Sequence, residues 1–283
     1  MWLPIAILPF LVIAFGARLA PWVFMWLLSF ALFFGLKWLV LMRAREKIAD
    51  SNSRSFAFLF AWPGMDAETF LDVRQTPPPP SLATWACAIT ETIVGTVLLW
   101  GIARLIPPAN LLARGWVGML GLILLLHFGS FQVISLFWQS HGLKADPIMV
   151  APLRSTSLSE FWGRRWNLGF RQLAHELVFR PIYRRLGPET AGLLVFAVSG
   201  IIHDLVISLP ARAGYGLPTL YFLIQGGGVS IERSQFGKRI GLGRGVRGWC
   251  FMMLSLVVPL FGLFHPWFVM RVILPFMKAI HAL

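Results

Sequence analysis

The stretch that decides the fold has two parts. The first, Ser157–Gly187, reads SLSEFWGRRWNLGFRQLAHELVFRPIYRRLG, and the second, Ala191–Pro210, reads AGLLVFAVSGIIHDLVISLP. The first part is basic, contains two tryptophans and is too polar to span a bilayer. The second part is an apolar run in which His203 and Asp204 are embedded. Ionisable side chains inside a membrane span are costly, so this pair indicates a functional site.

The composition identifies the class of protein. Of the 283 residues, 57% are hydrophobic and 13% are charged. A soluble domain cannot hide that much apolar surface, whereas a helical membrane protein can. The net charge of +13 would suggest nucleic acid in a soluble protein, but basic cytoplasmic loops account for it here. We therefore expect an all-α, polytopic helical membrane protein that is surrounded by membrane lipid and has no nucleic-acid partner.

Eight apolar runs are candidate membrane spans. The first could also be a signal peptide, but it lacks a basic leading region, so a span is the preferred interpretation. No internal repeat and no second soluble domain is visible in the sequence, so we expect one membrane-embedded domain, 1–283, with its core at 157–210. The expected spans are residues 3–15, 22–42, 81–106, 116–139, 191–209, 216–231, 248–264 and 266 onward.

The charges of the loops predict the orientation. If both termini are cytoplasmic, the inner loops 43–81, 142–189 and 232–247 carry five, eight and five Lys or Arg residues. The outer turns then carry no more than two each. Cytoplasmic loops retain Lys and Arg, so this asymmetry predicts a multi-pass integral membrane protein with both termini in the cytoplasm.

The basic segment predicts an interfacial amphipathic helix. Ser157 and Glu160 fit a capping box, with the serine at the N-cap and the glutamate at the third helical position. Apolar residues then recur at three- and four-residue steps, while Glu160, Arg164, Asn167 and Arg171 fall on another side. A helix that only anchors to anionic lipid is the alternative, but it leaves Asn167 unexplained.

His203 is the candidate general base. Ser199 and Gly200 lie one turn earlier and leave a hydroxyl group and space on the same face. Asp204 points about 100° away on a helix, so it is not expected to orient the imidazole. The histidines and cysteines show no ligand spacing, so no metal site is predicted. The cluster Gly226–Gly228 predicts close helix packing.

Two motifs, FWGRRWN at Phe161–Asn167 and SGIIHDL at Ser199–Leu205, resemble the membrane-bound O-acyltransferase superfamily. They are most similar to the wax-synthase branch, in which a tryptophan-asparagine segment precedes a span that reads SG-x-x-H, an acidic residue and leucine. That branch usually has glutamate after the histidine, whereas this chain has Asp204. The resemblance is close only in this region of the chain.

The resemblance implies an enzyme that transfers a fatty acyl group from acyl-CoA to the hydroxyl of a lipophilic alcohol. His203 would be the general base, and Asn167 would donate a hydrogen bond to the developing oxyanion. Acyl-CoA would be the co-substrate, with no further cofactor. The arginines are expected to hold the phosphates of CoA. The expected substrate-binding residues are Arg164, Arg165, Arg171, Trp166 and Asp204.

Two alternatives are open. The acceptor could be another hydroxyl compound, such as a sterol, a secondary metabolite or a glycan. In a different class, a proton-coupled transporter could use His203, Asp204 and Glu91 as a relay. Transporters often show repeat symmetry, which is not visible in this sequence, so the enzyme is the preferred interpretation. The oligomeric state is left unassigned.

Overall fold

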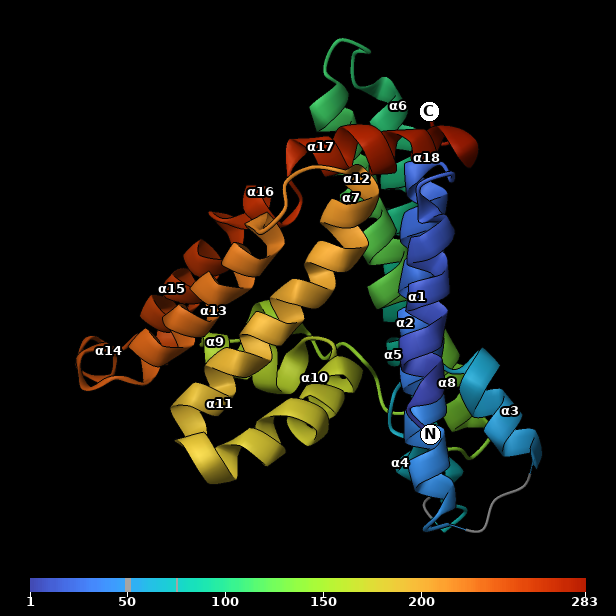
Figure 1. Cartoon of the computed structure of the whole chain (residues 1–283), viewed down its shortest axis with the longest axis vertical. Coiled ribbons are helices and arrows are strands. Elements are labelled where there is room, and N and C mark those ends of the chain that lie inside the picture. Colours follow the sequence, from blue (N-terminus) through green and yellow to red (C-terminus); the bar gives the residue numbers. More distant parts are fainter. Residues whose placement is uncertain (49–51, 75) are drawn as a thin grey trace. The chain divides into compact units, whose positions relative to one another are not determined.

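The computed structural model describes residues 1–48, 52–74 and 76–283. Within these ranges the chain is helical and contains no β-strand, which confirms the all-α prediction. It forms two compact units (Figure 1). The first unit is Met1–Ile148 with Val269–Leu283, and the second is Met149–Phe268. The expectation of a single domain stays a prediction, and each unit is described by itself.

The first unit is built from helices that pack through small residues. A Cβ atom added to Gly95 would lie 2.5 Å from the backbone nitrogen of Leu125, so the two backbones meet without side chains between them. Such close approach is typical of helices in membranes. The helices are α1 (Leu3–Gly16), α2 (Pro21–Arg45), α3 (Asn52–Ala61), α4 (Ala67–Leu71), α5 (Leu82–Thr96), α6 (Ala103–Leu105), α7 (Leu111–Ile123), α8 (Phe131–Ser140) and α18 (Leu274–Ala279), with π-helical segments at Val97–Ile102, Leu124–Ser130 and Val269–Ile273.

Lys37 ties α2 to the segment that follows α3. Its side chain is fully buried. Its Nζ donates hydrogen bonds to the carbonyl oxygens of Trp62, at 2.8 Å, and Gly64, at 2.7 Å. The same nitrogen lies 3.2 Å from the centroid of the Phe58 ring. Hydrogen bonds of an amino group are strong in a low dielectric, so Lys37 holds this segment on α2.

The predicted polar connector 43–81 therefore has structure of its own. It contains α3 and α4, which the sequence analysis did not identify. Asp66 caps α4 by accepting a hydrogen bond from the backbone N–H of Thr69 at 2.9 Å. Residues 49–51 and 75 of this connector lie outside the described residues.

The second unit contains both motifs (Figure 1). Its helices are α9 (Leu158–Glu160), α10 (Leu168–Ala174), α11 (Arg180–His203), α12 (Leu209–Ala211), α13 (Leu217–Arg233), α14 (Gln235–Ile240), α15 (Gly245–Val257), α16 (Leu260–Leu263) and α17 (Pro266–Phe268). A 3-10 turn lies at Pro152–Arg154, and π-helical segments lie at Phe161–Arg165, His175–Phe179 and Asp204–Ser208.

The prediction of one continuous amphipathic helix is wrong. The chain leaves the helical conformation at Asn167, which has φ 43° and ψ 62°, so α9 with its π-helical extension is separate from α10. A second break lies at Gly187, with φ 79° and ψ 172°. Both breaks place a residue in the region of positive φ, which asparagine and glycine tolerate best. We call residues 168–187 the basic arm. This arm thus ends before the fifth predicted span begins.

Helices α11 and α13 pack closely through glycines (Figure 1). A Cβ atom added to Gly200 would lie 2.6 Å from the Cα atom of Thr219. Gly226 and Gly228 lie against side chains of α11 and α9, respectively, while a Cβ atom at Gly227 would meet nothing within 4 Å. The predicted packing role of the glycine cluster is therefore confirmed at its first and third positions.

Several helices are long enough to cross a membrane. Among the described residues, five helical stretches are long and apolar enough: Pro21–Arg45, Leu82–Leu105, Leu111–Ser140, Leu168–Ala211, which is broken at Gly187, and Gly245–Leu263. Helix α13 has 17 residues and α1 has 14. A helix of 14 residues rises only about 21 Å, which is less than the roughly 30 Å hydrocarbon core. The membrane architecture is confirmed, whereas the count of eight spans stays a prediction.

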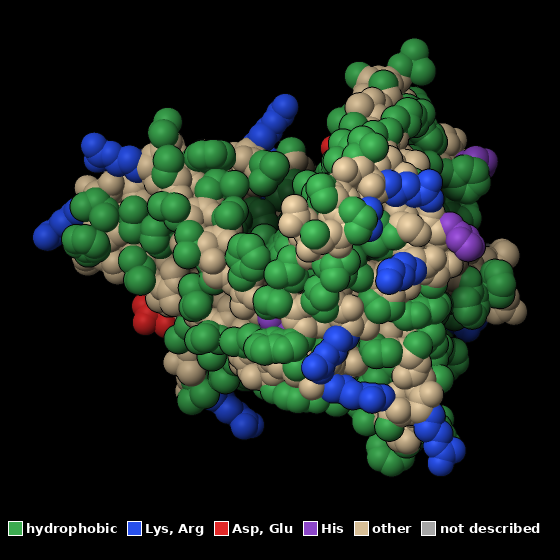
Figure 2. Space-filling model, turned by 90° about the horizontal axis from the view of Figure 1, so that it is seen from above, with side chains coloured by type: hydrophobic (Ala, Val, Ile, Leu, Met, Phe, Trp, Pro, Cys, Tyr) green, Lys and Arg blue, Asp and Glu red, His purple; other side chains and the backbone are tan. Residues whose placement is uncertain are grey.

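The surface is that of an integral membrane protein. Hydrophobic side chains are spread widely over the face drawn in Figure 2, and Lys and Arg side chains project from it at several points. Exposed apolar residues include Phe10 at 68%, Leu82 at 87% and Val258 at 70% of their full surface. Such extensive apolar surface would cause association in water, but in a bilayer it is the surface that lipid covers.

We expect Lys37→Met to lower the melting temperature of the detergent-solubilised protein by several degrees. Methionine keeps the apolar stem but leaves two buried carbonyl groups unpaired, each at a cost of about 1–3 kcal/mol. Lys47→Met is the control, because it removes an exposed ion pair with Glu68 and should change the melting temperature little. If both variants melt like the wild type, Lys37 does not hold the segment in place.

Candidate active site

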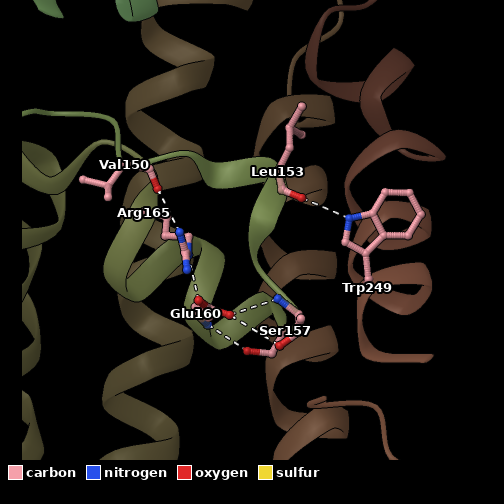
Figure 3. Close-up of polar contacts among 7 residues, drawn as sticks. Val150, Leu153, Ser157, Glu160, Arg165 and Trp249 are labelled. Carbon is pink, nitrogen blue, oxygen red and sulfur yellow. Dashed lines mark hydrogen bonds and ion pairs between the residues drawn. The ribbon is translucent and has the colours of Figure 1, made fainter. Parts of the chain in front are cut away.

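The basic segment begins with a network of polar contacts (Figure 3). The Oγ atom of Ser157 accepts a hydrogen bond from the backbone N–H of Glu160 at 3.0 Å, which confirms the predicted N-cap. The Glu160 carboxylate accepts one from the backbone N–H of Thr156 at 2.9 Å. This backbone hydrogen bond, with the Arg165 guanidinium beside it, lowers the pKa of the Glu160 carboxyl. The network fixes the start of α9.

The three predicted CoA-binding arginines have different surroundings. Arg165 Nε donates to Glu160 at 2.7 Å, and its guanidinium also reaches the carbonyl of Val150 at 3.3 Å (Figure 3). Arg164 and Arg171 are exposed, and their side chains have no hydrogen bond or ion pair with any described residue. Arg165 thus braces the turn, while Arg164 and Arg171 are free to meet an anion. Binding of CoA by the three stays a prediction.

Asn167 has a structural role that the sequence analysis did not identify. It adopts the left-handed conformation and forms the N-cap of α10, where its Oδ1 accepts a hydrogen bond from the backbone N–H of Phe170 at 3.2 Å. Its own backbone N–H lies 3.2 Å from Met149 Sδ. The cap engages Oδ1, which is an acceptor. The amide Nδ2, which is a donor, is therefore the part of the side chain that can bind a substrate.

His203 is held in a defined tautomer. It is the last residue of α11, and its Nδ1 lies 2.7 Å from the carbonyl oxygen of Ser199. A carbonyl oxygen only accepts hydrogen bonds, so Nδ1 carries the proton and Nε2 of the neutral ring keeps its lone pair. The π-helical segment Asp204–Ser208 follows directly, and such segments frequently occur at functional sites.

Aromatic rings connect the first motif with His203. The ring centroid of Trp162 lies 5.6 Å from that of Phe222, which in turn lies 4.3 Å from that of His203. Trp166 stacks on Phe161 at 5.4 Å, with an angle of 15° between the ring planes. Both predicted catalytic residues therefore belong to the second unit, and the His203 ring shares its aromatic packing. We call the rings of Trp162, Phe196 and Phe222 the aromatic wall.

Asp204 caps α13. One carboxylate oxygen accepts from the hydroxyl of Ser208 at 2.8 Å and from the backbone N–H of Gly216 at 2.9 Å. The other accepts from the backbone N–H of Thr219 at 3.0 Å and from the Thr219 hydroxyl. The first N–H groups of a helix lack partners within it, and the carboxylate supplies them. A substrate-binding role for Asp204 stays a prediction.

Two further buried residues complete the second unit. Glu232, 5% exposed, accepts hydrogen bonds from the backbone N–H groups of Leu158, at 2.6 Å, and Ser159, at 3.3 Å. It therefore caps α9 from the end of α13. His265 is fully buried, and its Nε2 lies 3.4 Å from Ser208 Oγ. The only sequence signal for Glu232 was an acidic residue at the edge of a basic loop.

Comparison with known proteins supports the motif assignment. Residues 145–224, which include both motifs, match the model of the membrane bound O-acyl transferase family. The probable long-chain-alcohol O-fatty-acyltransferase 7 of Arabidopsis thaliana is 31% identical over 141 residues, which are 44% of this chain and 40% of that protein. The long-chain-alcohol O-fatty-acyltransferase of Simmondsia chinensis is 34% identical over 100 residues, 32% of this chain and 28% of that protein.

The name of a third relative gives a different acceptor, a sterol. Acyl-CoA–sterol O-acyltransferase 1 of Arabidopsis thaliana is 34% identical over 98 residues, 32% of this chain and 28% of that protein. The chain spans less than half the length of each of these relatives. The resemblance to the membrane-bound O-acyltransferase superfamily and its wax-synthase branch is confirmed.

We expect Asp204→Asn to lower the melting temperature of the substrate-free protein, because an amide group cannot accept at both ends. The free energy of unfolding should fall by at least the contribution of one hydrogen bond to a charged group, about 1.5–3 kcal/mol. Glu189→Gln is the control, since Glu189 is an exposed acid of the same unit. An unchanged melting temperature together with a raised KM for substrate would instead assign Asp204 to substrate binding.

Proposed function

We propose, from the membrane bound O-acyl transferase segment at residues 145–224, that the whole protein transfers a fatty acyl group from acyl-CoA to the hydroxyl of a lipophilic alcohol. The names of two relatives support an alcohol as the acceptor. The observation that carries the chemistry is the hydrogen bond from His203 Nδ1 to the Ser199 carbonyl, because it leaves Nε2 as the proton acceptor. Acyl-CoA is the co-substrate, and the reaction needs no further cofactor.

The chemistry proceeds in one addition and one elimination. The alcohol oxygen attacks the thioester carbonyl carbon while His203 Nε2 takes the hydroxyl proton. The Asn167 Nδ2 group donates to the oxygen on which negative charge develops. The C–S bond then breaks, and the departing thiolate takes the proton back from His203. The ester and the CoA thiol leave, and the imidazole is neutral again.

The predicted topology brings acyl-CoA to the site from the cytoplasm. With both termini cytoplasmic, the loop 142–189 faces the compartment that contains CoA. Arg164 and Arg171 are exposed in this loop and suit the phosphates of the nucleotide end. The alcohol enters from the surrounding lipid.

A sterol is the second candidate acceptor, because one relative is named as a sterol acyltransferase. The named relatives are all acyltransferases, which favours the enzyme over a proton-coupled transporter. The test uses purified protein in vesicles with labelled acyl-CoA and either a long-chain alcohol or a sterol. We expect labelled ester with the alcohol. Label only in sterol ester would change the acceptor, and no ester with either compound would contradict the proposed function.

We expect His203→Ala to lower ester synthesis by about two or more orders of magnitude, because no other group is assigned to take the hydroxyl proton. The variant should enter the membrane normally. His175→Ala, an exposed histidine of the basic arm, is the matched control and should keep near wild-type activity. Activity of His203→Ala equal to that of His175→Ala would contradict the mechanism.

Asn167→Asp separates the two roles of Asn167. Aspartate is as good an N-cap as asparagine and also tolerates the left-handed conformation, so the melting temperature should change little. Aspartate cannot donate to an oxyanion, so turnover should fall by about 10²–10³. Full turnover in this variant would restrict Asn167 to its capping role. A loss of turnover together with a large fall in the melting temperature would show instead that the negative charge disrupts the fold.

A further inference from the structure

Three buried polar atoms of the second unit have no hydrogen-bond partner among the described residues: Ser155 Oγ, Trp162 Nε1 and Gln225 Oε1. Two of them are complementary, because the indole Nε1 of Trp162 is a donor and the amide Oε1 of Gln225 is an acceptor. Buried polar groups in folded proteins are nearly always paired, so an unpaired donor and an unpaired acceptor in one unit require an explanation. A ligand that supplies both partners is one.

The side chain of Gln225 is fixed in orientation by a proline. Its Nε2 donates to the carbonyl oxygen of Ser255 at 2.7 Å. In a regular helix that carbonyl would accept from the residue four positions later, which is Pro259 and has no N–H group. Because the amide nitrogen of Gln225 must face this carbonyl, the amide oxygen is the atom left without a partner.

Both residues are connected to the candidate catalytic residue through Phe222. The Trp162 ring packs on Phe222 at 5.6 Å and on Phe196 at 6.0 Å, within the aromatic wall. Gln225 is fully buried one turn after Phe222 on α13, and the Phe222 ring lies against His203. The surroundings are apolar, so a charged group would not be stable there.

We propose that Trp162 and Gln225 bind a secondary amide of the pantetheine arm of acyl-CoA, an inference that rests on the proposed function. The indole N–H donates to the amide carbonyl, and the Gln225 oxygen accepts from the amide N–H. The arm is uncharged, unlike the phosphates of CoA, and so suits an apolar site. The alcohol hydroxyl fits less well, because its single proton is needed at His203 and cannot also be given to Gln225.

Trp162→Phe tests the donor, since phenylalanine keeps an aromatic ring and removes the N–H group. The KM for acyl-CoA should rise about three- to ten-fold, which is the effect of one neutral hydrogen bond. The KM for the alcohol should not change. The melting temperature without substrate should stay the same or rise, because an unpaired buried donor is lost. Trp26→Phe is the matched control, as Trp26 Nε1 in the first unit is also buried without a partner among the described residues.

The amide itself is tested with two truncated acyl donors. S-Palmitoyl pantetheine carries both amides but no nucleotide, and an S-palmitoyl alkanethiol of equal length carries no amide. The wild type should prefer the first donor, and Trp162→Phe should reduce this preference by the same factor by which it raises the KM. Gln225→Met, which removes the acceptor, should act in the same direction and decides the question if Trp162→Phe does not accumulate.

The outcomes separate this inference from the proposed function. If the wild type makes no ester from acyl-CoA with any acceptor, the proposed function is wrong. If the wild type makes ester and both variants keep its preference for the pantetheine donor, only the inference is wrong. A rise in the KM for the alcohol, with that for acyl-CoA unchanged, would also overturn it, because the pair would then bind the acceptor.

Discussion

The close approach of α11 and α13 at Gly200 is the constraint on which the second unit depends. With the Cα atom of Thr219 2.6 Å from where a Cβ atom would stand, no other residue fits there without displacing a helix. This contact brings the start of α13 within reach of Asp204, next to His203. The far end of the same helix carries Glu232 to α9. One small residue thus allows α13 to connect the histidine motif with the tryptophan-asparagine motif.

The helical membrane class could be predicted because it follows from long apolar runs, which need no knowledge of tertiary contacts. The breaks at Asn167 and Gly187 could not. A single residue with positive φ leaves the three- and four-residue spacing on either side intact, so the pattern reads as one helix. The helices within 43–81 were missed for another reason, since their packing depends on Lys37, a residue of a different helix.

The candidate site could likewise be predicted only in part from the sequence. His203 could be selected as a candidate because it is an ionisable residue in an apolar span, and Asn167 because an uncharged amide between arginines is not explained by lipid anchoring. Their local roles could not be predicted, since the tautomer of His203 depends on one carbonyl group and the cap of Asn167 on one N–H group. Glu232 could not be predicted at all, because the N–H group that it binds lies 74 residues away in the sequence.

The capping of α13 by Asp204 has a consequence for how this segment evolves. The wax-synthase branch usually carries glutamate after the histidine, and glutamate is longer by one methylene group. Its carboxylate could meet the N–H groups of Gly216 and Thr219 only if α13 began farther from α11 or its loop followed another path. An exchange of aspartate for glutamate at this position should therefore require a compensating change in the loop before α13.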